Sequence, residues 1–380
     1  MNILDQDILL NLFQRHYLFF AGCVFVLALM LTMYLTPKVL WVSREKGLIT
    51  EVNHRSSHKV AVPPFGGVSF FLVLVLVILL LQALRESNTG NNLVIGLCFL
   101  FLAGLKDDLV VSSARLKMIS QLFAGIFIVF SPELTLNNLQ GFLGIYEIPL
   151  ILGYGLKLLL VVALINAYNL IDGIDGLAAI VGIIISLTYA LVFHVSGKEY
   201  FVLISLAVSG ILAGFLRFNF SREKNKIFMG DGGSLIIGFM IAFLSLKLVV
   251  MDIEASVIYH SLLPENRLLF ALAVLFIPIF DTLRVIVIRL GNGNSPFEAD
   301  RNHMHHVLLD LGLNHKKASF SLGAFNLLVI FCYVLGSQFL NNWGLFYLMI
   351  ILIGLSAALF NYLKKLGAKK IEERDLVPGE

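Results

Sequence analysis

Residues 148–176, IPLILGYGLKLLLVVALINAYNLIDGIDG, decide the fold class because an apolar run leads directly into a polar one. The apolar part, residues 148–167, has about the 20 residues that a helix needs to cross the hydrocarbon core of a bilayer. The rest of the 380-residue chain is similar, with 58% hydrophobic residues, 14% charged residues and a mean hydropathy of +0.88. This composition excludes a soluble protein and predicts an integral membrane protein.

Further runs of this kind predict an all-α, polytopic membrane protein of about eleven spanning helices, within a range of ten to twelve. We expect residues 1–363 to form a single transmembrane domain and residues 364–380 to form a tail. The spans are predicted near 17–37, 65–84, 92–105, 116–131, 148–167, 176–195, 200–218, 232–250, 268–289, 319–338 and 343–363.

The distribution of basic residues predicts the orientation of these spans. The loops after odd-numbered spans and the tail carry 22 Lys and Arg residues, whereas the opposite loops carry four. Because cytoplasmic loops are enriched in Lys and Arg, the N-terminus is predicted outside and the C-terminus in the cytoplasm. The net charge of the whole chain is only +3. Such a balance gives no reason to expect nucleic acid as a partner.

The polar part of the opening stretch is the first candidate site. Four amide and carboxylate side chains recur there at every third position, so on a helix they form a slowly turning polar stripe. A single Asp could serve as the N-cap of the next span, but four such groups exceed what capping requires. These residues are Asn166, Asn169, Asp172 and Asp175.

Two further acidic motifs fall on the same predicted cytoplasmic face. Adjacent carboxylates at a membrane boundary, Asp107 and Asp108, indicate a cation or a proton-transfer task, although a solvated loop paired with nearby cations fits equally well. The run from Phe228 to Ser234, FMGDGGS, opens the eighth predicted span. Its glycines, Gly230 included, would offer backbone N–H groups to a phosphate, and Asp231 would then need a divalent cation beside it. Mg²⁺ is expected, with Mn²⁺ as the alternative. The alternative interpretation is that Asp231 is only the N-cap of the eighth span.

Basic residues dominate the last two motifs. The run DRNHMHH at 300–306 supplies Arg and His donors for anionic oxygens. Zinc is conceivable for its three His residues, but neither a Cys nor an H-E-x-x-H pattern accompanies them. In the loop before Pro63, Arg55 and Lys59 suit a phosphate head group at the membrane surface, although they serve topology equally well.

Taken together and in this order, the motifs closely resemble those of the polyprenyl-phosphate N-acetylhexosamine-1-phosphate transferases, in particular their WecA/TagO-like bacterial branch. The resemblance runs from about Asn53 to Gly312 and rests on the acidic pair, the Asn/Asp run, FMGDGGS and the histidine motif. One departure is that Thr50 and Val52 stand where many relatives have Asp and Pro.

The resemblance implies a role for each matching residue. Asp231 and Asn169 would hold the metal, Phe228 would stack on uracil and Asp175 would hydrogen-bond it. Asp107 would face a lipid phosphate, with Asp108 and Asp172 completing a catalytic acidic site. The remaining substrate contacts are expected from Asn166, Gly230, Arg55, Lys59, Arg301, His303, His305 and His306.

The resemblance also implies the reaction. Undecaprenyl phosphate and a UDP-N-acetylhexosamine, by default UDP-GlcNAc, would give UMP and the lipid-diphosphate-sugar that initiates a cell-envelope polysaccharide such as O-antigen or teichoic acid. The active-site loops of this single catalytic domain are then 38–64, 106–115, 166–176, 219–234 and 290–318, at the bacterial cytoplasmic membrane. The attacking phosphate is already mostly dianionic at pH 7, so Asp107 either accepts a proton or only orients the nucleophile. A covalent aspartyl-phosphate route and the oligomeric state, a homodimer included, stay open.

Three other classes fit the residues less well. A secondary transporter would need inverted repeats and polar groups near the bilayer midplane, which the sequence does not show. An intramembrane aspartyl protease would need Gly where Phe228 stands. A structural scaffold would leave five polar clusters on one face without explanation.

Overall fold

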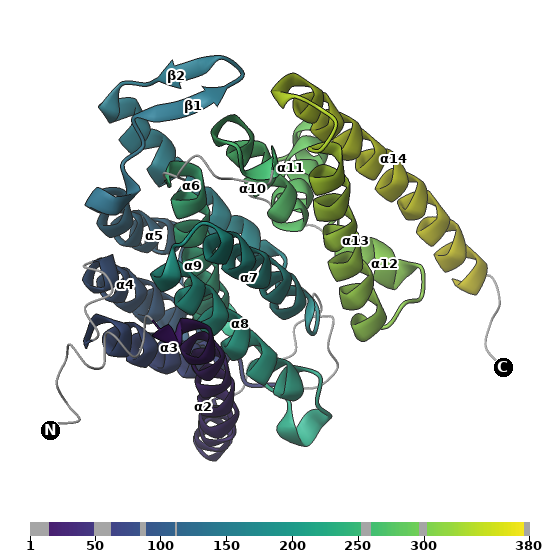
Figure 1. The fold of residues 1–380 in the computed structure, drawn as a ribbon. Helices are drawn as coiled ribbons and strands as arrows, with labels where there is room; N and C mark the ends of the chain where they lie inside the picture. The colour runs from purple at the N-terminus through teal and green to yellow at the C-terminus, as the bar shows by residue number, and fades with distance from the viewer. Residues whose placement is uncertain are drawn as a thin grey trace, which may run out of the picture.

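The computed structural model describes residues 15–48, 62–83, 89–110, 112–251, 260–295 and 302–375. In these residues the chain forms a bundle of long helices with a small hairpin at one end (Figure 1). The helices are α2 Tyr17–Glu45, α3 Gly66–Ala83, α4 Thr89–Leu109, α5 Ala114–Val129, α6 Leu150–Leu170, α7 Leu177–Val195, α8 Glu199–Asn219, α9 Gly230–Val250, α10 Arg267–Val274, α11 Phe276–Gly291, α12 Met304–Asp310, α13 His315–Gly336 and α14 Asn342–Asp375.

Among the described residues, eight helices are long and apolar enough to cross a membrane, and a ninth span results if the bent pair Pro264–Val274 and Phe276–Gly291 is counted as one. Helices α4 and α5 occupy the third and fourth predicted spans but are not among these helices, and α5 has only 16 residues. The polytopic membrane fold is therefore confirmed, whereas the number eleven and the orientation stay predictions.

The structure corrects two details of the expected fold. The fold is not purely α-helical: before α6, β1 Asn138–Phe142 pairs antiparallel with β2 Ile145–Glu147, and Gly141 and Gly144 adopt positive φ in this hairpin. The span predicted as one helix over 268–289 is broken at Leu275, with a bend of 72°. Pro278 explains the break, because it lacks the N–H that a continuous helix would need there and its ring excludes a helical carbonyl four residues earlier.

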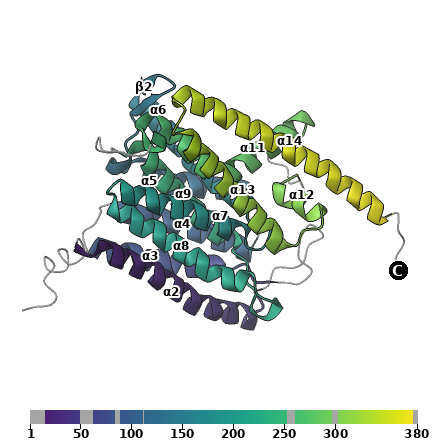
Figure 2. The same ribbon diagram turned by 45° about the vertical axis from the view of Figure 1, so that its right-hand side comes forward.

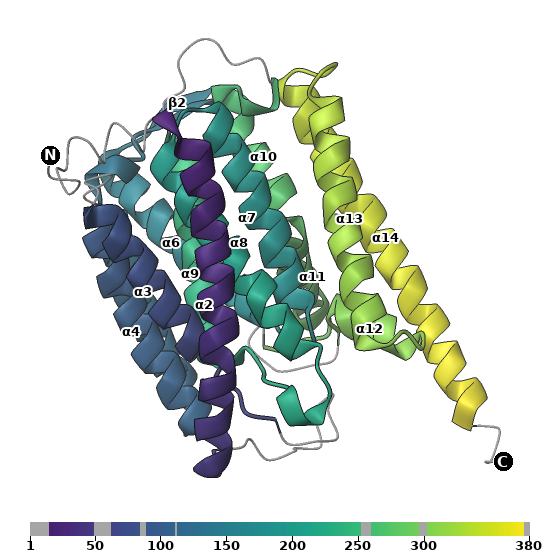
Figure 3. The same ribbon diagram turned by 60° about the horizontal axis from the view of Figure 1, so that its bottom comes forward.

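Helix α9 forms the centre of the bundle and packs against α3, α4, α6 and α7. Of the residues in its most apolar stretch, 83% are buried. Helices α2 and α8 lie side by side at close range (Figure 3). Gly210 and Gly214, four residues apart on α8, lie against the backbone carbonyls of Phe25 and Leu29. Small residues at this spacing let membrane helices approach closely, so the pair fixes how α2 covers the bundle.

Helices α13 and α14 stand on the opposite side from α2, α3 and α4 (Figure 3). Helix α14 continues past the beginning of α13 (Figure 2), and its last turns pack beside α12. The ends of α4 and α6 and the beginnings of α3, α7, α9 and α13 all lie at the end of the bundle away from the hairpin. The sequence motifs are attached to these helix ends.

Candidate active site

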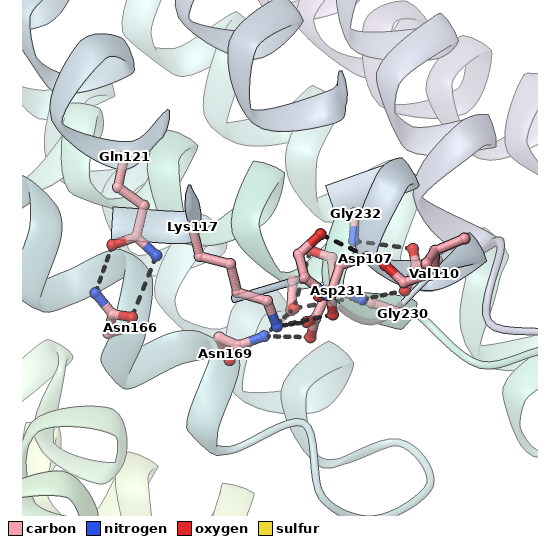
Figure 4. A network of polar contacts seen from close by, with 12 residues as sticks. Asp107, Val110, Lys117, Gln121, Asn166, Asn169, Gly230, Asp231 and Gly232 are labelled. Atoms are coloured by element: carbon pink, nitrogen blue, oxygen red, sulfur yellow. Dashed lines mark hydrogen bonds and ion pairs between the residues drawn. The ribbon is translucent and has the colours of Figure 1, made fainter. Parts of the chain in front are cut away.

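Three of the predicted polar residues meet at this end of the bundle, one each from α4, α6 and α9 (Figure 4). The amide nitrogen of Asn169 donates to Asp231 Oδ1 at 2.9 Å and to Ser234 Oγ at 2.7 Å. The ammonium group of Lys117, from α5, lies 2.8 Å from Asp107 Oδ2 and also contacts Asp231 Oδ2. A cation thus lies between two carboxylates that are far apart in the sequence. We call Asp107, Lys117, Asn169 and Asp231 the acidic cluster.

Glycines bring the helix ends of the acidic cluster together. A Cβ on Gly104 of α4 would meet the backbone of Gly232, and a Cβ on Gly67 of α3 would meet the backbone of Gly233. The segment before α3 is paired with the motif as well, since Phe228 N–H donates to Pro63 O at 2.9 Å and Gly66 N–H to Phe228 O at 3.0 Å. The glycines of FMGDGGS therefore serve close helix packing.

The same packing places a carboxyl group at the expected phosphate cradle. The N–H groups of Asp231 and Gly232 at the start of α9 donate to the carboxylate of Asp108, at 2.8 and 3.0 Å. Gly230 has a φ of +72°, and a Cβ there would meet Pro64 O and the Asp108 carboxylate. Asp108 therefore caps α9 and takes the N–H groups that were expected to bind phosphate. Gly230 is needed for the backbone turn.

Buried carboxyl groups gather at this end of the bundle, and ionising them without a nearby cation costs free energy. Asp107 and Asp108 lie in the last turn of α4, past its apolar stretch, and burial raises the pKa of Asp108 to about 8. Between α6 and α7, burial raises the pKa of Asp172 well above its usual value, and the carboxylates of Asp231 and Asp108 add to the shift. Carboxylates that resist ionisation where they stand are groups that a divalent cation stabilises.

Asp175 and Phe228 form a second part of the site. Lys226 Nζ lies 2.5 Å from Asp175 Oδ2 and 5.5 Å from the centre of the Phe228 ring. His315, the first residue of α13, approaches the same carboxylate oxygen at 3.2 Å. Neither aspartate of the DGIDG run caps α7, because the N-cap residue is Gly176. The two residues expected to bind the nucleobase are thus neighbours, linked by Lys226.

The histidine turn, residues 302–306, lies against the Asn/Asp run. A Cβ on Gly173 would meet the ring of His305, which is 2% exposed. The rings of His305 and His306 are 4.3 Å apart, while His303 turns to Asp281. Burial, together with the neighbouring rings, lowers the pKa of His305 to about 2, so its ring is neutral. Within the described residues, no three His, Cys, Asp or Glu side chains are grouped closely enough to hold a metal ion.

Of the remaining predicted residues, one is described and lies apart from this arrangement, and three lie outside the described residues. Asn166 forms two hydrogen bonds with Gln121, donating to its Oε1 at 2.6 Å and accepting from its Nε2 at 3.2 Å. Its amide is thereby held between α5 and α6 by protein groups. The other three, Arg55, Lys59 and Arg301, lie outside the described residues.

Sequence reasoning missed three polar side chains of this end of the bundle. Lys117 was counted only as a basic residue for topology, although a lone lysine just inside an apolar run is itself a signal. Lys226 was treated in the same way. Asp281 lies in an apolar run and is 1% exposed, which makes it a buried charge that requires a partner.

Comparisons with known proteins agree with this geometry. A family model described as glycosyl transferase family 4 matches residues 91–249, which include the acidic cluster. The chain is 31% identical over 300 residues to a Bacillus subtilis protein named "Probable undecaprenyl-phosphate N-acetylglucosaminyl 1-phosphate transferase", covering 77% of this chain and 78% of that protein.

Two further relatives extend the comparison. A decaprenyl-phosphate N-acetylglucosaminephosphotransferase of Mycolicibacterium smegmatis is 32% identical, with 77% of this chain and 76% of that protein covered. An undecaprenyl-phosphate alpha-N-acetylglucosaminyl 1-phosphate transferase of Escherichia coli is 27% identical, with 84% of each chain covered. The resemblance found in the motifs is thus confirmed, and the chain belongs to the polyprenyl-phosphate N-acetylhexosamine-1-phosphate transferases of glycosyl transferase family 4, which are membrane phosphotransferases.

Proposed function

We propose that this protein transfers N-acetylglucosamine 1-phosphate from UDP-N-acetylglucosamine to undecaprenyl phosphate at the bacterial cytoplasmic membrane, releasing UMP and starting a cell-envelope polysaccharide. The observation that carries the proposal is the convergence of Asp107 and Asp231, from two different helices, on the ammonium of Lys117, with Asn169 of a third helix hydrogen-bonded to Asp231. The names of the relatives support undecaprenyl phosphate as the acceptor and N-acetylglucosamine 1-phosphate as the group transferred.

The donor set fits Mg²⁺. Asp231 would supply a carboxylate oxygen and Asn169 its amide oxygen, and among the described residues no hydrogen bond reaches that amide oxygen. Mg²⁺ usually takes one or two protein oxygens and fills its remaining positions with phosphate oxygens and water, so these two residues are sufficient. The ammonium of Lys117 already lies between Asp107 and Asp231, which indicates that their oxygens favour a positive charge. When bound, Mg²⁺ would neutralise the diphosphate oxygens and polarise the β-phosphorus.

The chain's own residues then have three tasks. Lys117 would shift from the carboxylates to phosphate oxygens and hold the lipid phosphate and the diphosphate next to each other. Phe228 and Asp175 would bind the uracil ring. A lipid-phosphate oxygen would attack the β-phosphorus, forming one P–O bond while the bond from the β-phosphorus to the bridging oxygen breaks, and that oxygen would leave with UMP.

Asp107 would orient the nucleophile and not accept a proton. Both of its carboxylate oxygens are engaged, one by the N–H of Ser112 at 2.6 Å and the other by Lys117. We therefore expect Asp107→Asn to keep a measurable rate with the pH profile of the wild type. Loss of the acidic limb of that profile would favour general-base work instead.

The proposal is tested by incubating the purified full-length protein with undecaprenyl phosphate, Mg²⁺ and a panel of UDP-sugars, and by measuring UMP. We expect UMP release with UDP-N-acetylglucosamine and little with UDP-glucose, which lacks the acetamido group. Turnover of a fucosamine- or quinovosamine-type N-acetyl sugar alone would keep the reaction and change the sugar. If no UDP-sugar gives UMP while the protein moves one of them across proteoliposomes, the transferase proposal is wrong and a transporter is favoured.

A further inference from the structure

We propose that Asp281 is a positioning residue that fixes the orientation of the His303 ring and the nitrogen on which it carries its proton. Asp281 lies on α11, and its Oδ2 is 2.9 Å from Nδ1 of His303. Its catalytic consequence rests on the proposed function, in which His303 contacts the diphosphate or the sugar. The orientation of the His303 ring and the position of its proton are inferred from the hydrogen bonds alone.

The hydrogen bonds of Asp281 determine the state of the ring. Oδ1 accepts the backbone N–H of Met304 at 2.8 Å, and Asp281 is 1% exposed. An ionised carboxylate can only accept hydrogen bonds, so Nδ1 of His303 must carry a proton. The end of the ring available to a ligand is therefore Nε2, which accepts a hydrogen bond when the ring is neutral and donates one when it is protonated.

The other supports of the histidine turn act on its backbone, on a neighbouring side chain or on the face of the His303 ring. Arg284, one turn further along α11, donates to Asn302 O at 2.6 Å. Lys364 of α14 donates to Asn302 Oδ1 at 2.6 Å. The ring of His305 stacks on that of His303 with centroids 5.6 Å apart. Among these groups, Asp281 is the one that hydrogen-bonds a ring nitrogen of His303, so changing it should alter the imidazole before it alters the turn.

Asp281→Asn provides a sharp test because the geometry allows one orientation of the new amide. Its oxygen must remain at the Met304 N–H, since two donors would otherwise face each other there. Its NH₂ group must then face Nδ1 of His303 and donate to it. The proton of the neutral ring would move from Nδ1 to Nε2, which reverses the donor and acceptor ends of the imidazole.

The first measurement is the ¹⁵N spectrum of the histidine rings in the full-length protein, with the His303 signals assigned by their loss in His303→Gln. We expect a protonated Nδ1 in the wild type and a protonated Nε2 with a bare Nδ1 in Asp281→Asn. A wild-type ring with its proton on Nε2 alone, or a pattern that Asp281→Asn leaves unchanged, would overturn the proposal. The wild-type spectrum tests the proposal even if the variant does not fold. It also tests it independently of the proposed function, because it requires no turnover of a UDP-sugar.

The second measurement is a double-mutant cycle on kcat/KM. Asp281→Asn should lower kcat/KM about 10- to 100-fold, the usual range for residues that orient a functional histidine. In the His303→Gln background the same change should lower it no further, because the effect passes through the ring. Equal losses in both backgrounds would show a general structural role and contradict the proposal. Thr282→Val, at the next position of α11, is the matched control and should leave kcat/KM unchanged.

Discussion

Each end of the helix bundle holds a lysine among oxygen atoms, and the two differ in the kind of oxygen. At the acidic cluster, Lys117 contacts side-chain carboxylates that are 13% and 26% exposed. At the hairpin end, Lys157 is 1% exposed and donates to the backbone carbonyls of Val129 at 2.5 Å and Leu134 at 2.8 Å. Backbone carbonyls fixed in a fold cannot exchange their partner, whereas carboxylates near water can. The first lysine is therefore suited to function and the second to stability.

Arg267 repeats the pattern of the hairpin end. It is 1% exposed and donates to the carbonyls of Leu262 and Met251 and to the side chain of Gln140. These bonds join the hairpin to the segments before α10. A buried cation that is satisfied by the backbone is thus a structural device in this fold.

The largest effect is expected at Asp231. The comparison of the two bundle ends predicts that activity depends completely on an exchangeable cation at this carboxylate. Asp231→Asn should lower UMP release by about 10³-fold or more, because an amide binds a divalent cation far less well than a carboxylate. Glu147→Gln, an exposed carboxylate on the hairpin, is the matched control and should leave the rate unchanged. Turnover retained by Asp231→Asn in a detergent assay would remove this residue from the metal site.

The next largest effect is expected at Lys117. Lys117→Met should lower kcat/KM by about 10²-fold, since it removes a charged contact to the phosphates. Without Mg²⁺ it should also lower the melting temperature, because Asp107 and Asp231 would face each other with no cation between them. Saturating Mg²⁺ should close that stability gap. If the gap persists in Mg²⁺, the lysine and the metal do not share the same carboxylates.

A smaller effect is expected at the nucleobase site. Phe228→Ala should raise the KM for the UDP-sugar about tenfold while kcat changes less, because stacking on a base contributes about 1–3 kcal/mol. Phe339→Ala provides a control, since that side chain is 82% exposed between α13 and α14. An unchanged KM would count against stacking on uracil.

How much of the fold and of the site could be predicted from the sequence depends on how far apart in the chain the interacting residues lie. The helices follow from apolar runs, and Asn169 and Asp231 were expected to share a site because their motifs recur together in a family. Lys117 and Asp281 could not be placed in this way, because each acts on residues more than 20 positions away through packing that no local pattern specifies. The same limit applies to the expected phosphate cradle: two N–H groups at the start of α9 donate to the side chain of Asp108, which lies 123 positions before Asp231.

The smallest effect on activity, and a large effect on stability, is expected at Lys157. Lys157→Met leaves two buried carbonyls without a donor, which should cost about 2–4 kcal/mol of folding free energy and lower the melting temperature. The kcat per folded molecule should stay within about twofold of the wild type, because Lys157 lies at the start of α6 and Asn169 at its end, about 18 Å along the helix at 1.5 Å per residue. The pair Lys117→Met and Lys157→Met thus separates the two ends: the first should lose rate and respond to Mg²⁺, and the second should lose stability in a manner that Mg²⁺ does not restore. A loss of kcat in Lys157→Met with an unchanged melting temperature would show that the hairpin end is coupled to catalysis, and the distinction between functional and structural lysines would not hold.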